Sequence, residues 1–572
     1  MSCESQDRSV ASRTGDRAAL EGQQEIRKDA RYRWLPVLLL ALTLGLTAVF
    51  VSRGIRKGEF SINVDETIHA CSGLYFASFI RDLPLRHPFQ YTYVYYAHYP
   101  ELGLIEYPPV LYVAEGVMFY LFGPSVLTAR VTILIFALLG AYFFFRTVAY
   151  LADEWTAAAC TLLLTLLPSV LLFEKANMLD LPAMALGVGA AYYWIRYLRE
   201  ERASLLYGFC IFAVLELLTK QQSVYVLLWC LLTIVVMGKW RLVLNRNAVL
   251  SVCLSAAVLL PYYLYTVRLT LPVVVANLTH GVRTQPYPYV YYLIQLPSQL
   301  GWPLLALSIA GMASCYWWGK RENVVPMALW IVACFLTETA MSNKVPRYII
   351  YWIPPLVYFA VAPLTLRSVP KWSRTVLGVV LAGLLVHAGV SAWSFQRPYV
   401  SGYAELAHRL LGEKEGVVLV DLKLPGDLIF FVGGSDPERR FIIDRKALYV
   451  VRNVKQYGSM ELVHSAEDVQ NVMRRNGVKY VAIEQGMPLK FEAAQNALRE
   501  LLLTKQFKLL AEFPLATNDP DYAGHRLLLY ENLQAVPPSA DVYRVKMMTL
   551  DHDIEVPMST MVDGFSSQSG ER

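Results

Sequence analysis

The chain contains 572 residues, of which 55% are hydrophobic, 13% are aromatic and 17% are charged. This composition is too apolar for an ordinary soluble protein of several domains, and it predicts a polytopic membrane protein. The formal net charge of +6 is small and is not gathered in one block, so we do not expect the chain to bind nucleic acid. The eight cysteines form no CxxC motif and are interpreted as packing residues.

Residues 1–33 form a polar leader that we expect to be disordered. The first apolar run, Trp34 to Val51, is not followed by a small-residue cleavage site, so it is interpreted as an uncleaved anchor and not as a signal peptide. A helical span takes about 20 apolar residues, and runs of this kind predict about eleven spans in a mainly α membrane bundle over residues 34–395. The expected spans are 34–52, 126–151, 155–173, 181–198, 204–219, 222–238, 247–266, 292–318, 324–341, 348–366 and 374–395.

Basic residues predict the orientation of these spans, because short cytoplasmic loops are rich in Lys and Arg. The leader ends in a basic segment, which places the N-terminus in the cytoplasm, and every second loop should then also be cytoplasmic. Four of those loops are basic, and an odd number of spans puts the C-terminus on the outer side. The basic residues of these loops are Arg196, Arg199 and Arg202; Lys239, Arg241 and Arg246; Lys320 and Arg321; and Arg367, Lys371 and Arg374.

The first outer loop, residues 53–125, is long and unusual in composition. Within it, Pro108 to Phe122 is apolar but too short for a span, and it is interpreted as a juxtamembrane or re-entrant helix. The loop is also rich in tyrosine, a residue that favours the lipid headgroup level. We therefore expect its tyrosines to form an interfacial belt along the membrane.

After Trp393 the pattern becomes that of a soluble α/β domain, assigned to residues 396–536 and expected to be extracytoplasmic. Helix-like segments at Tyr403 to Leu411, Ala466 to Asn476 and Phe491 to Leu503 alternate with β-rich runs. These runs are Val417 to Asp421, Val478 to Glu484 and Arg526 to Tyr530. The tail, residues 537–572, is expected to be flexible.

The predicted topology gathers unusual polar residues on the outer side. The carboxylates are those of the first outer loop and of the next outer loop, and the cations lie at later outer ends. Such a set suits a reaction that takes a proton from an acceptor hydroxyl while an anionic group departs. Sugar transfer from a lipid phosphate has this form, and a single displacement would invert the anomeric carbon. The residues are Asp65, Glu66, His69, Glu101, Glu106, Glu174, Asp180, Lys220, His280, Arg283, Lys344 and Arg347.

Several short motifs occur in a fixed order: Asp65-Glu66 after the first span, Glu106-Tyr-Pro-Pro109 before an apolar helix, Asp180-Leu-Pro182, Leu218-Thr-Lys220 and Pro346-Arg-Tyr348. This order resembles that of the PMT-like glycosyltransferases, whose membrane domain has the GT-C fold. Their kin include protein O-mannosyltransferases and the aminoarabinose transferase that modifies lipid A. The resemblance covers residues 34–366 and implies a polyprenyl-phosphate-linked sugar as donor. The acceptor implied is a protein, a glycolipid or a wall glycan.

By this resemblance Asp65 matches the catalytic acidic residue of the first outer loop, with Glu66 beside it, and Asp180 matches a second acidic residue. Lys220 and Arg347 match positions that hold the donor phosphate, and the neighbouring cations Lys344 and Arg283 are assigned to the same role. Glu106 and His280 resemble a pair that binds a divalent metal ion in the lipid A enzymes. The Lys that the family commonly has before Pro-Pro is replaced here by Tyr107.

Other interpretations of these residues remain open from the sequence. Asp65-Glu66 and Asp180 fit helix N-termini, where carboxylates are favourable caps, and Lys220 and Arg347 fit cations that reach the interface from helix ends. A transporter or lipid flippase is an alternative function, which would place ionisable residues at mid-bilayer in broken helices. A bundle that only anchors a partner-binding outer domain is another. A polyprenyl donor of the bacterial type would place the protein in the inner (plasma) membrane.

Overall fold

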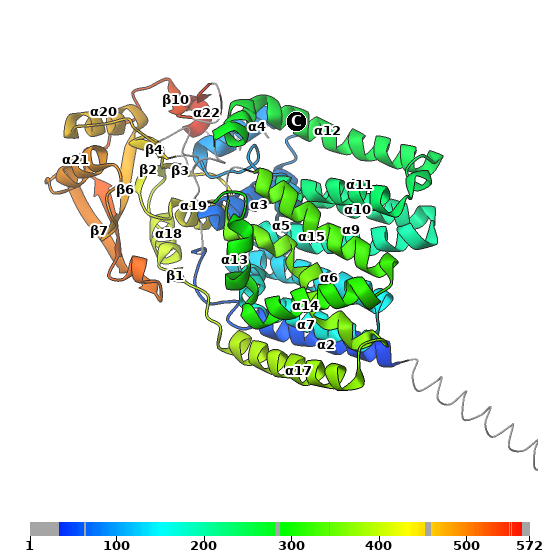
Figure 1. The fold of residues 1–572 in the computed structure, drawn as a ribbon. Helices are drawn as coiled ribbons and strands as arrows, with labels where there is room; N and C mark the ends of the chain where they lie inside the picture. Colours follow the sequence, from blue (N-terminus) through cyan, green and yellow to red (C-terminus); the bar gives the residue numbers. More distant parts are fainter. Residues whose placement is uncertain are drawn as a thin grey trace, which may run out of the picture.

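The computed structural model describes residues 34–61, 64–280, 287–341, 344–451, 459–547, 550 and 552–562; for residues 270–280 and 451 it describes the backbone alone. A bundle of long helices forms one side of the molecule, and a β-sheet domain with its own helices forms the other (Figure 1). Between them lie helices of the segment that the sequence assigns to the first outer loop. The mainly α bundle with a C-terminal α/β domain is therefore confirmed.

Each predicted span is occupied by one helix or by two or three consecutive helices. In the described part of the chain, five single helices are long and apolar enough to cross a membrane, and two bent pairs raise this number to seven. The single helices are α2 (Leu35–Ser52), α6 (Val126–Leu151), α12 (Arg246–His280, apolar over Arg246–Leu269), α15 (Arg321–Ala340) and α17 (Lys371–Ser394). The bent pairs are α7 (Glu154–Leu166) with α8 (Pro168–Glu174), and α13 (Tyr291–Leu300) with α14 (Trp302–Trp318).

The remaining helices of the bundle are shorter or more polar. They are α9 (Asp180–Glu200), α10 (Ala203–Leu217), η1 (Gln221–Val224), α11 (Tyr225–Met237), η2 (Trp240–Leu242), η4 (Pro346–Tyr351), α16 (Ile353–Val361) and η5 (Ala362–Thr365). Local sequence explains several helix starts. The hydroxyl of Ser125 accepts a hydrogen bond from the Thr128 amide at the start of α6, and the Asp153 carboxylate accepts one from the Thr156 amide at the start of α7.

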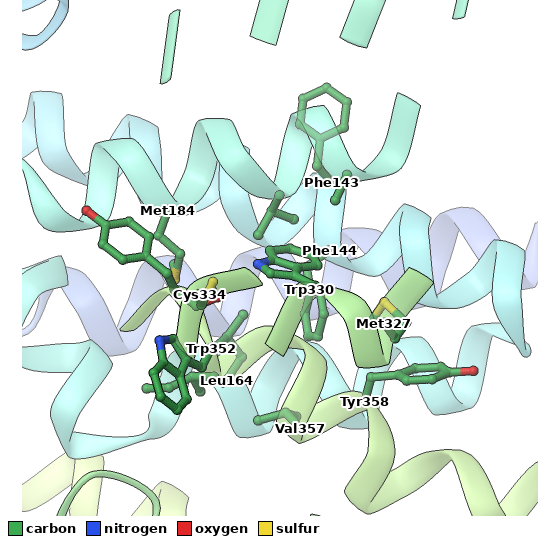
Figure 2. Packing of buried hydrophobic residues seen from close by; sticks show 14 of the residues in the cluster. Phe143, Phe144, Leu164, Met184, Met327, Trp330, Cys334, Trp352, Val357 and Tyr358 are labelled. Atoms are coloured by element: carbon green, nitrogen blue, oxygen red, sulfur yellow. Dashed lines mark hydrogen bonds between the residues drawn. The ribbon is translucent and has the colours of Figure 1, made fainter. Parts of the chain in front are cut away.

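The bundle core is rich in large aromatic side chains. Figure 2 shows Trp330 of α15, Phe144 of α6, Trp352 and Leu164 among the side chains of this buried cluster. Trp330 also lies 5.3 Å from Trp229 of α11, measured between ring centroids. Each such ring buries a large apolar surface and leaves few ways to repack, so the core fixes the relative places of α6, α11, α15 and α16.

Gly311 of α14 lies where two helices touch at backbone distance. A Cβ atom placed there would be 1.8 Å from the carbonyl oxygen of Phe359 in α16. Replacing Gly311 with Ala should therefore force α14 and α16 apart and lower stability by about 1–3 kcal/mol. A lowered Tm of the purified protein would confirm this result. The matched control is Gly383→Ala in α17, where a Cβ meets nothing within 4 Å, and an equal loss of Tm there would contradict the argument.

The first outer loop is itself helical. It contains α3 (Val64–Asp82), α4 (Pro88–His98) and α5 (Val110–Phe122), the last of which matches the predicted short helix. The expectation of a tyrosine belt is wrong for most of these rings. Tyr91, Tyr95 and Tyr99 are each at most 2% exposed, because they pack against one another and against the C-terminal domain.

The C-terminal domain is built on a five-stranded sheet of order β3-β2-β6-β9-β7, in which β3, β2 and β6 are parallel and β9 runs antiparallel to both of its neighbours, β6 and β7. The helices predicted at 403–411 and 466–476 are confirmed with the same bounds. The strands of the sheet are β2 (Gly416–Asp421), β3 (Phe441–Asp444), β6 (Val478–Gln485), β7 (Phe507–Pro514) and β9 (Arg526–Asn532). The helices of the domain are α18 (Tyr403–Leu411), α19 (Pro425–Ser435), α20 (Ala466–Asn476), α21 (Glu492–Leu502) and η6 (Pro520–Tyr522).

Alternating residues of β2 face two separate cores. Val418 and Val420 pack with α18 and α19, whereas Val417 and Leu419 pack with α20 and α21. Both cores continue into the first outer loop: the first takes in Phe60, Leu74 and Tyr91 of that loop, and the second takes in Val94 and Ala97 of α4. The sheet domain and the loop thus share their hydrophobic cores.

Small sheets complete the domain. In the described part of the tail, β10 pairs with β11, and α22 follows. The side chains of Tyr543, Val545, Ile554 and Val556 are buried in the core next to α4, which orders this part of the tail. The strands are β1 (Val400–Ser401) with β8 (Ala516–Thr517), β4 (Tyr449–Val451) with β5 (Ser459–Glu461), and β10 (Val542–Val545) with β11 (Ile554–Pro557); α22 is Met558–Val562.

Candidate active site

Asp65 lies in the first turn of α3, where the helix N-terminus favours a carboxylate. The Nη2 atom of Arg347 donates a hydrogen bond of 3.1 Å to its Oδ2 atom. The two side chains are 12% and 17% exposed, so this pair is partly open. Arg347 belongs to the short helix η4, whose start is fixed by Pro346 at the first helical position.

Asp180 occupies the first turn of α9 and forms a second ion pair, which is closed to solvent. The Nζ atom of Lys220 donates to its Oδ1 atom at 2.5 Å, and the side chains are 2% and 1% exposed. The Nε atom of Arg347 lies 3.9 Å from the same Oδ1 atom. Arg347 therefore stands between the two carboxylates and joins the two pairs into one cluster.

Tyr348 supports both cations of this cluster. The Lys220 ammonium lies 4.8 Å from the centroid of the Tyr348 ring, and the guanidinium of Arg347 lies 5.8 Å from it. Gln222 donates to the Tyr348 hydroxyl at 3.2 Å. Within the described residues, Oδ2 of Asp180 and Nε of Arg347 have no hydrogen-bond partner, so the cluster retains polar capacity for a ligand.

His69 follows Asp65 by one helical turn and faces the same region. Its Nδ1 atom is 3.0 Å from the hydroxyl of Tyr112 in α5, and its ring meets that of Tyr107 edge to face at 5.2 Å. Burial lowers the pKa of His69 to about 4, although the nearby Asp65 carboxylate acts in the opposite direction. The imidazole is thus neutral at physiological pH and adds no charge to the cluster.

Glu66 points away from this cluster and is fully buried. Its Oε2 atom accepts a hydrogen bond from the Ser61 amide at 2.9 Å, and its Oε1 atom accepts one from the Asn177 amide at 2.8 Å. Arg397 pairs with the same Oε1 atom at 3.5 Å. Of the two adjacent acidic residues, it is therefore Asp65 that contacts the cluster of cations.

Lys344 and Arg283 differ from the other predicted cations. The ammonium of Lys344 donates to the carbonyl oxygens of Thr339 and Met341, at 2.7 Å and 2.8 Å, and so caps the end of α15. Among the described residues, Lys344 is not part of the ion pairs that Arg347 and Lys220 form with Asp65 and Asp180. Arg283 lies outside the described residues.

The predicted metal pair stays a prediction, because only one of its two side chains lies in the described part of the chain. Glu106 is exposed, and its carbonyl oxygen accepts a hydrogen bond from Gln221. His280 ends α12, and its side chain lies outside the described residues. No group of three or more His, Cys, Asp and Glu side chains that could hold a metal ion occurs among the residues described.

Comparisons with known proteins agree with the resemblance seen in the sequence. The model of the family described as dolichyl-phosphate-mannose-protein mannosyltransferase matches residues 106–265, which include Asp180 and Lys220. ArnT from Cupriavidus metallidurans bound to undecaprenyl phosphate is similar in structure, with a TM-score of 0.56 and 15% identity, over 88% of this chain and 99% of that chain. The same protein in the apo state gives a TM-score of 0.57 at 15% identity, over 89% and 100%.

The archaeal oligosaccharyltransferase AglB from Archaeoglobus fulgidus, in complex with an inhibitory peptide and a dolichol-phosphate, is also similar. Its TM-score is 0.52 at 13% identity, over 79% of this chain and 70% of that chain. The resemblance to the PMT-like, ArnT-like glycosyltransferases of the GT-C fold is confirmed. No curated protein matches this chain by sequence.

Within this PMT-like fold, the structure brings together Asp65 of α3, Asp180 of α9, Lys220 between α10 and η1, and Arg347 of η4. Sequence reasoning did not identify Tyr348 and Arg397 as neighbours of the predicted acids. Tyr348 had a usable signal, because it directly follows Arg347 and an aromatic ring next to a cation often stacks on it. Arg397 had none, since its contacts depend on how distant segments fold together.

Proposed function

We propose that this protein is an integral membrane glycosyltransferase that moves a sugar from a polyprenyl-phosphate-linked donor to a hydroxyl acceptor. The acceptor would be a protein, a glycolipid or a wall glycan. The observation that carries the proposal is the partly open pair of Asp65 and Arg347 beside the closed pair of Asp180 and Lys220. In this arrangement Asp65 would serve as a base, and Lys220 and Arg347 as cations, toward one bound ligand.

In the proposed step the Asp65 carboxylate takes the proton of the acceptor hydroxyl as its oxygen attacks the anomeric carbon. The bond between that carbon and the phosphate oxygen breaks, and the lipid phosphate leaves with the bonding electrons. Arg347 and Lys220 stabilise the negative charge that develops on the phosphate, so no general acid is needed. Attack from the side opposite the leaving group inverts the anomeric carbon.

Asp180 has a different role in this proposal. It is buried against Lys220 and close to Arg347, so it holds both cations in place before the donor binds. Preorganised charges avoid the cost of reorienting groups during the reaction. We derive no step through a metal ion, because the described residues do not assemble a set of ligands.

The membrane arrangement is part of the proposal. Residues 1–33 form a cytoplasmic leader, residues 34–395 form the catalytic membrane domain with about eleven spans, and residues 53–125 form the large outer loop. Residues 396–536 form the extracytoplasmic domain, followed by the tail 537–572. The alternating basic loops support this orientation, and a multi-pass protein of the inner membrane would have its cluster at the outer face.

Mass spectrometry of glycans and lipids from cells that lack the gene tests the proposal. One glycoconjugate should disappear and return when the wild-type gene is restored, and its structure names the sugar and the acceptor. An unchanged set of glycoconjugates, together with altered distribution of a lipid across the membrane, would favour the transporter or flippase instead.

Arg347→Gln should weaken binding of the lipid phosphate. A charge-assisted hydrogen bond is worth about 1.5–3 kcal/mol, so the Kd for undecaprenyl phosphate should rise roughly 10–150-fold. Native mass spectrometry of the purified protein with undecaprenyl phosphate measures this change. The matched control is Arg367→Gln, at an exposed arginine beyond η5, where the Kd should not change. Equal Kd values for wild type and Arg347→Gln would refute the phosphate-binding role.

A further inference from the structure

Arg397 lies in the linker between α17 and the C-terminal domain and is 6% exposed. Its guanidinium joins three segments that are far apart in the sequence. The Nη1 atom donates to the carbonyl oxygen of Lys175 at 3.3 Å, and the Nη2 atom donates to those of Lys57 and Glu59 at 3.2 Å and 2.8 Å. The same side chain pairs with Glu66. The Arg397 side chain therefore has four partners on these segments.

Arg397 and Glu66 together form a junction, by which we mean the contacts that tie residues 57–61 to Lys175 and Asn177. The two carboxylate oxygens of Glu66 tie the amide of Ser61, before α3, to the amide of Asn177, before α9, and the Asn177 side chain donates to the Glu66 carbonyl oxygen at 3.3 Å. Asp65 adjoins Glu66, and Asp180, the first residue of α9, follows Asn177 by three residues. The junction therefore sits at the starts of the two helices that carry the clustered carboxylates.

The C-terminal domain is fastened to this junction. The Glu59 carboxylate accepts hydrogen bonds from the amides of Gly402, Tyr403 and Ala404, at the start of α18, at 3.0–3.2 Å. The Asp427 carboxylate of α19 accepts one from the Phe60 amide at 3.2 Å. Movement of the domain would thus pull directly on residues 57–61, which Arg397 and Glu66 hold.

We infer that Arg397 and Glu66 are positioning residues, which hold Asp65 and Asp180 at their working separation and couple that separation to the docked C-terminal domain. This inference rests on the proposed function. Its physical basis is that a displaced helix start moves the carboxylate in its first turn, and a shift of about 1 Å at a reacting group can cost roughly 100-fold in rate. The cations that bind phosphate are not touched by the junction.

The test compares two matched variants of the full-length protein. Arg397→Met removes the four contacts of Arg397 from the junction, whereas Arg439→Met removes another buried arginine of the same domain interface, which pairs with Asp82 at 2.6 Å at the far end of α3. In cells that lack the native gene, Arg397→Met should form the glycoconjugate about 100-fold more slowly per mole of membrane protein. The Kd for undecaprenyl phosphate should stay within about threefold of wild type, since Lys220 and Arg347 are retained.

Arg439→Met should lower the Tm of the purified protein but leave the rate of product formation unchanged. Arg397→Lys, which keeps the charge, should recover at least about a tenth of the wild-type rate. A wild-type rate for folded Arg397→Met, or an equal loss of rate for Arg439→Met, would overturn the inference. If Arg397→Met does not fold, Glu66→Gln tests the same inference. The side-chain NH2 group of the glutamine would then face the backbone amide of Ser61 or that of Asn177, and one hydrogen bond of the junction would be lost.

For folded Glu66→Gln we expect a rate at least about tenfold below wild type with unchanged Kd, and a wild-type rate would overturn the inference. Asp65→Asn in the same assay separates this inference from the proposed function. Turnover by Asp65→Asn close to the wild-type rate would refute the proposed base whatever the Arg397 variants do. An inactive Asp65→Asn beside a fully active Arg397→Met would refute the positioning role alone.

Discussion

Asp65→Asn should abolish product formation while the protein still inserts, folds and binds the lipid phosphate. The amide cannot take the acceptor proton, and general base catalysis of this kind contributes about 10²–10⁴-fold. The same change removes a negative charge next to Arg347, so the Kd for undecaprenyl phosphate should be equal to that of wild type or lower. The rate is read from the glycoconjugate in complemented cells, and the Kd from native mass spectrometry.

The control for this variant lies on the same helix. Asp82 ends α3, about as far from the cluster as α3 allows, and Asp82→Asn keeps an oxygen that can accept from Tyr91 and Arg439. Its product formation should match that of wild type. Turnover by Asp65→Asn close to the wild-type rate, at a Tm close to that of wild type, would remove Asp65 from the role of base.

Lys220→Met should have the largest effect on stability. It leaves the Asp180 carboxylate buried without its ammonium partner, and loss of one partner of a buried ion pair costs about 3–5 kcal/mol. Arg347, at 3.9 Å from the same oxygen, offsets part of this cost, so we expect a loss near 3 kcal/mol. The variant should show a lowered Tm and a raised Kd for undecaprenyl phosphate.

The double variant Asp180→Asn with Lys220→Met separates the two effects. It removes both buried charges, and replacement of a buried pair by neutral groups is often neutral for stability. The Tm should therefore return close to the wild-type value, while lipid phosphate binding stays weak because Lys220 is absent. Restored binding in the double variant would show that Lys220 acts only through Asp180 and not on the phosphate.

The sequence was sufficient to predict that Asp65, Asp180, Lys220 and Arg347 gather. Each of these lies at the end of an apolar segment, and counting alternate loops assigns such ends to one side. It could not predict that Lys344 would turn from its neighbour Arg347 toward the carbonyl groups that end α15. That direction depends on the local backbone between α15 and η4, which has no periodic pattern to reveal it.

The same distinction applies to the fold. Helices α18 and α20 were predictable because their apolar residues recur at helical spacing, and α20 also has a capping box formed by Ser465 and Asp468. Helix α19 was missed, since its sequence is apolar almost throughout and starts with Pro425-Gly426. The tyrosines of α4 were placed at the lipid surface because the surface that buries them belongs to a part of the chain more than 300 residues later.

The shared cores of the first outer loop and the C-terminal domain also bear on biosynthesis. The Phe60 amide and its Asp427 partner are 367 residues apart, so the loop that carries Asp65 is made long before the surface that completes its core. Domains fold in the order in which they are synthesised, and contacts between distant segments form late. On the proposed function, Asp65 would therefore be synthesised well before the contacts that hold the start of its helix, and the candidate site would be complete only after the C-terminal domain has folded.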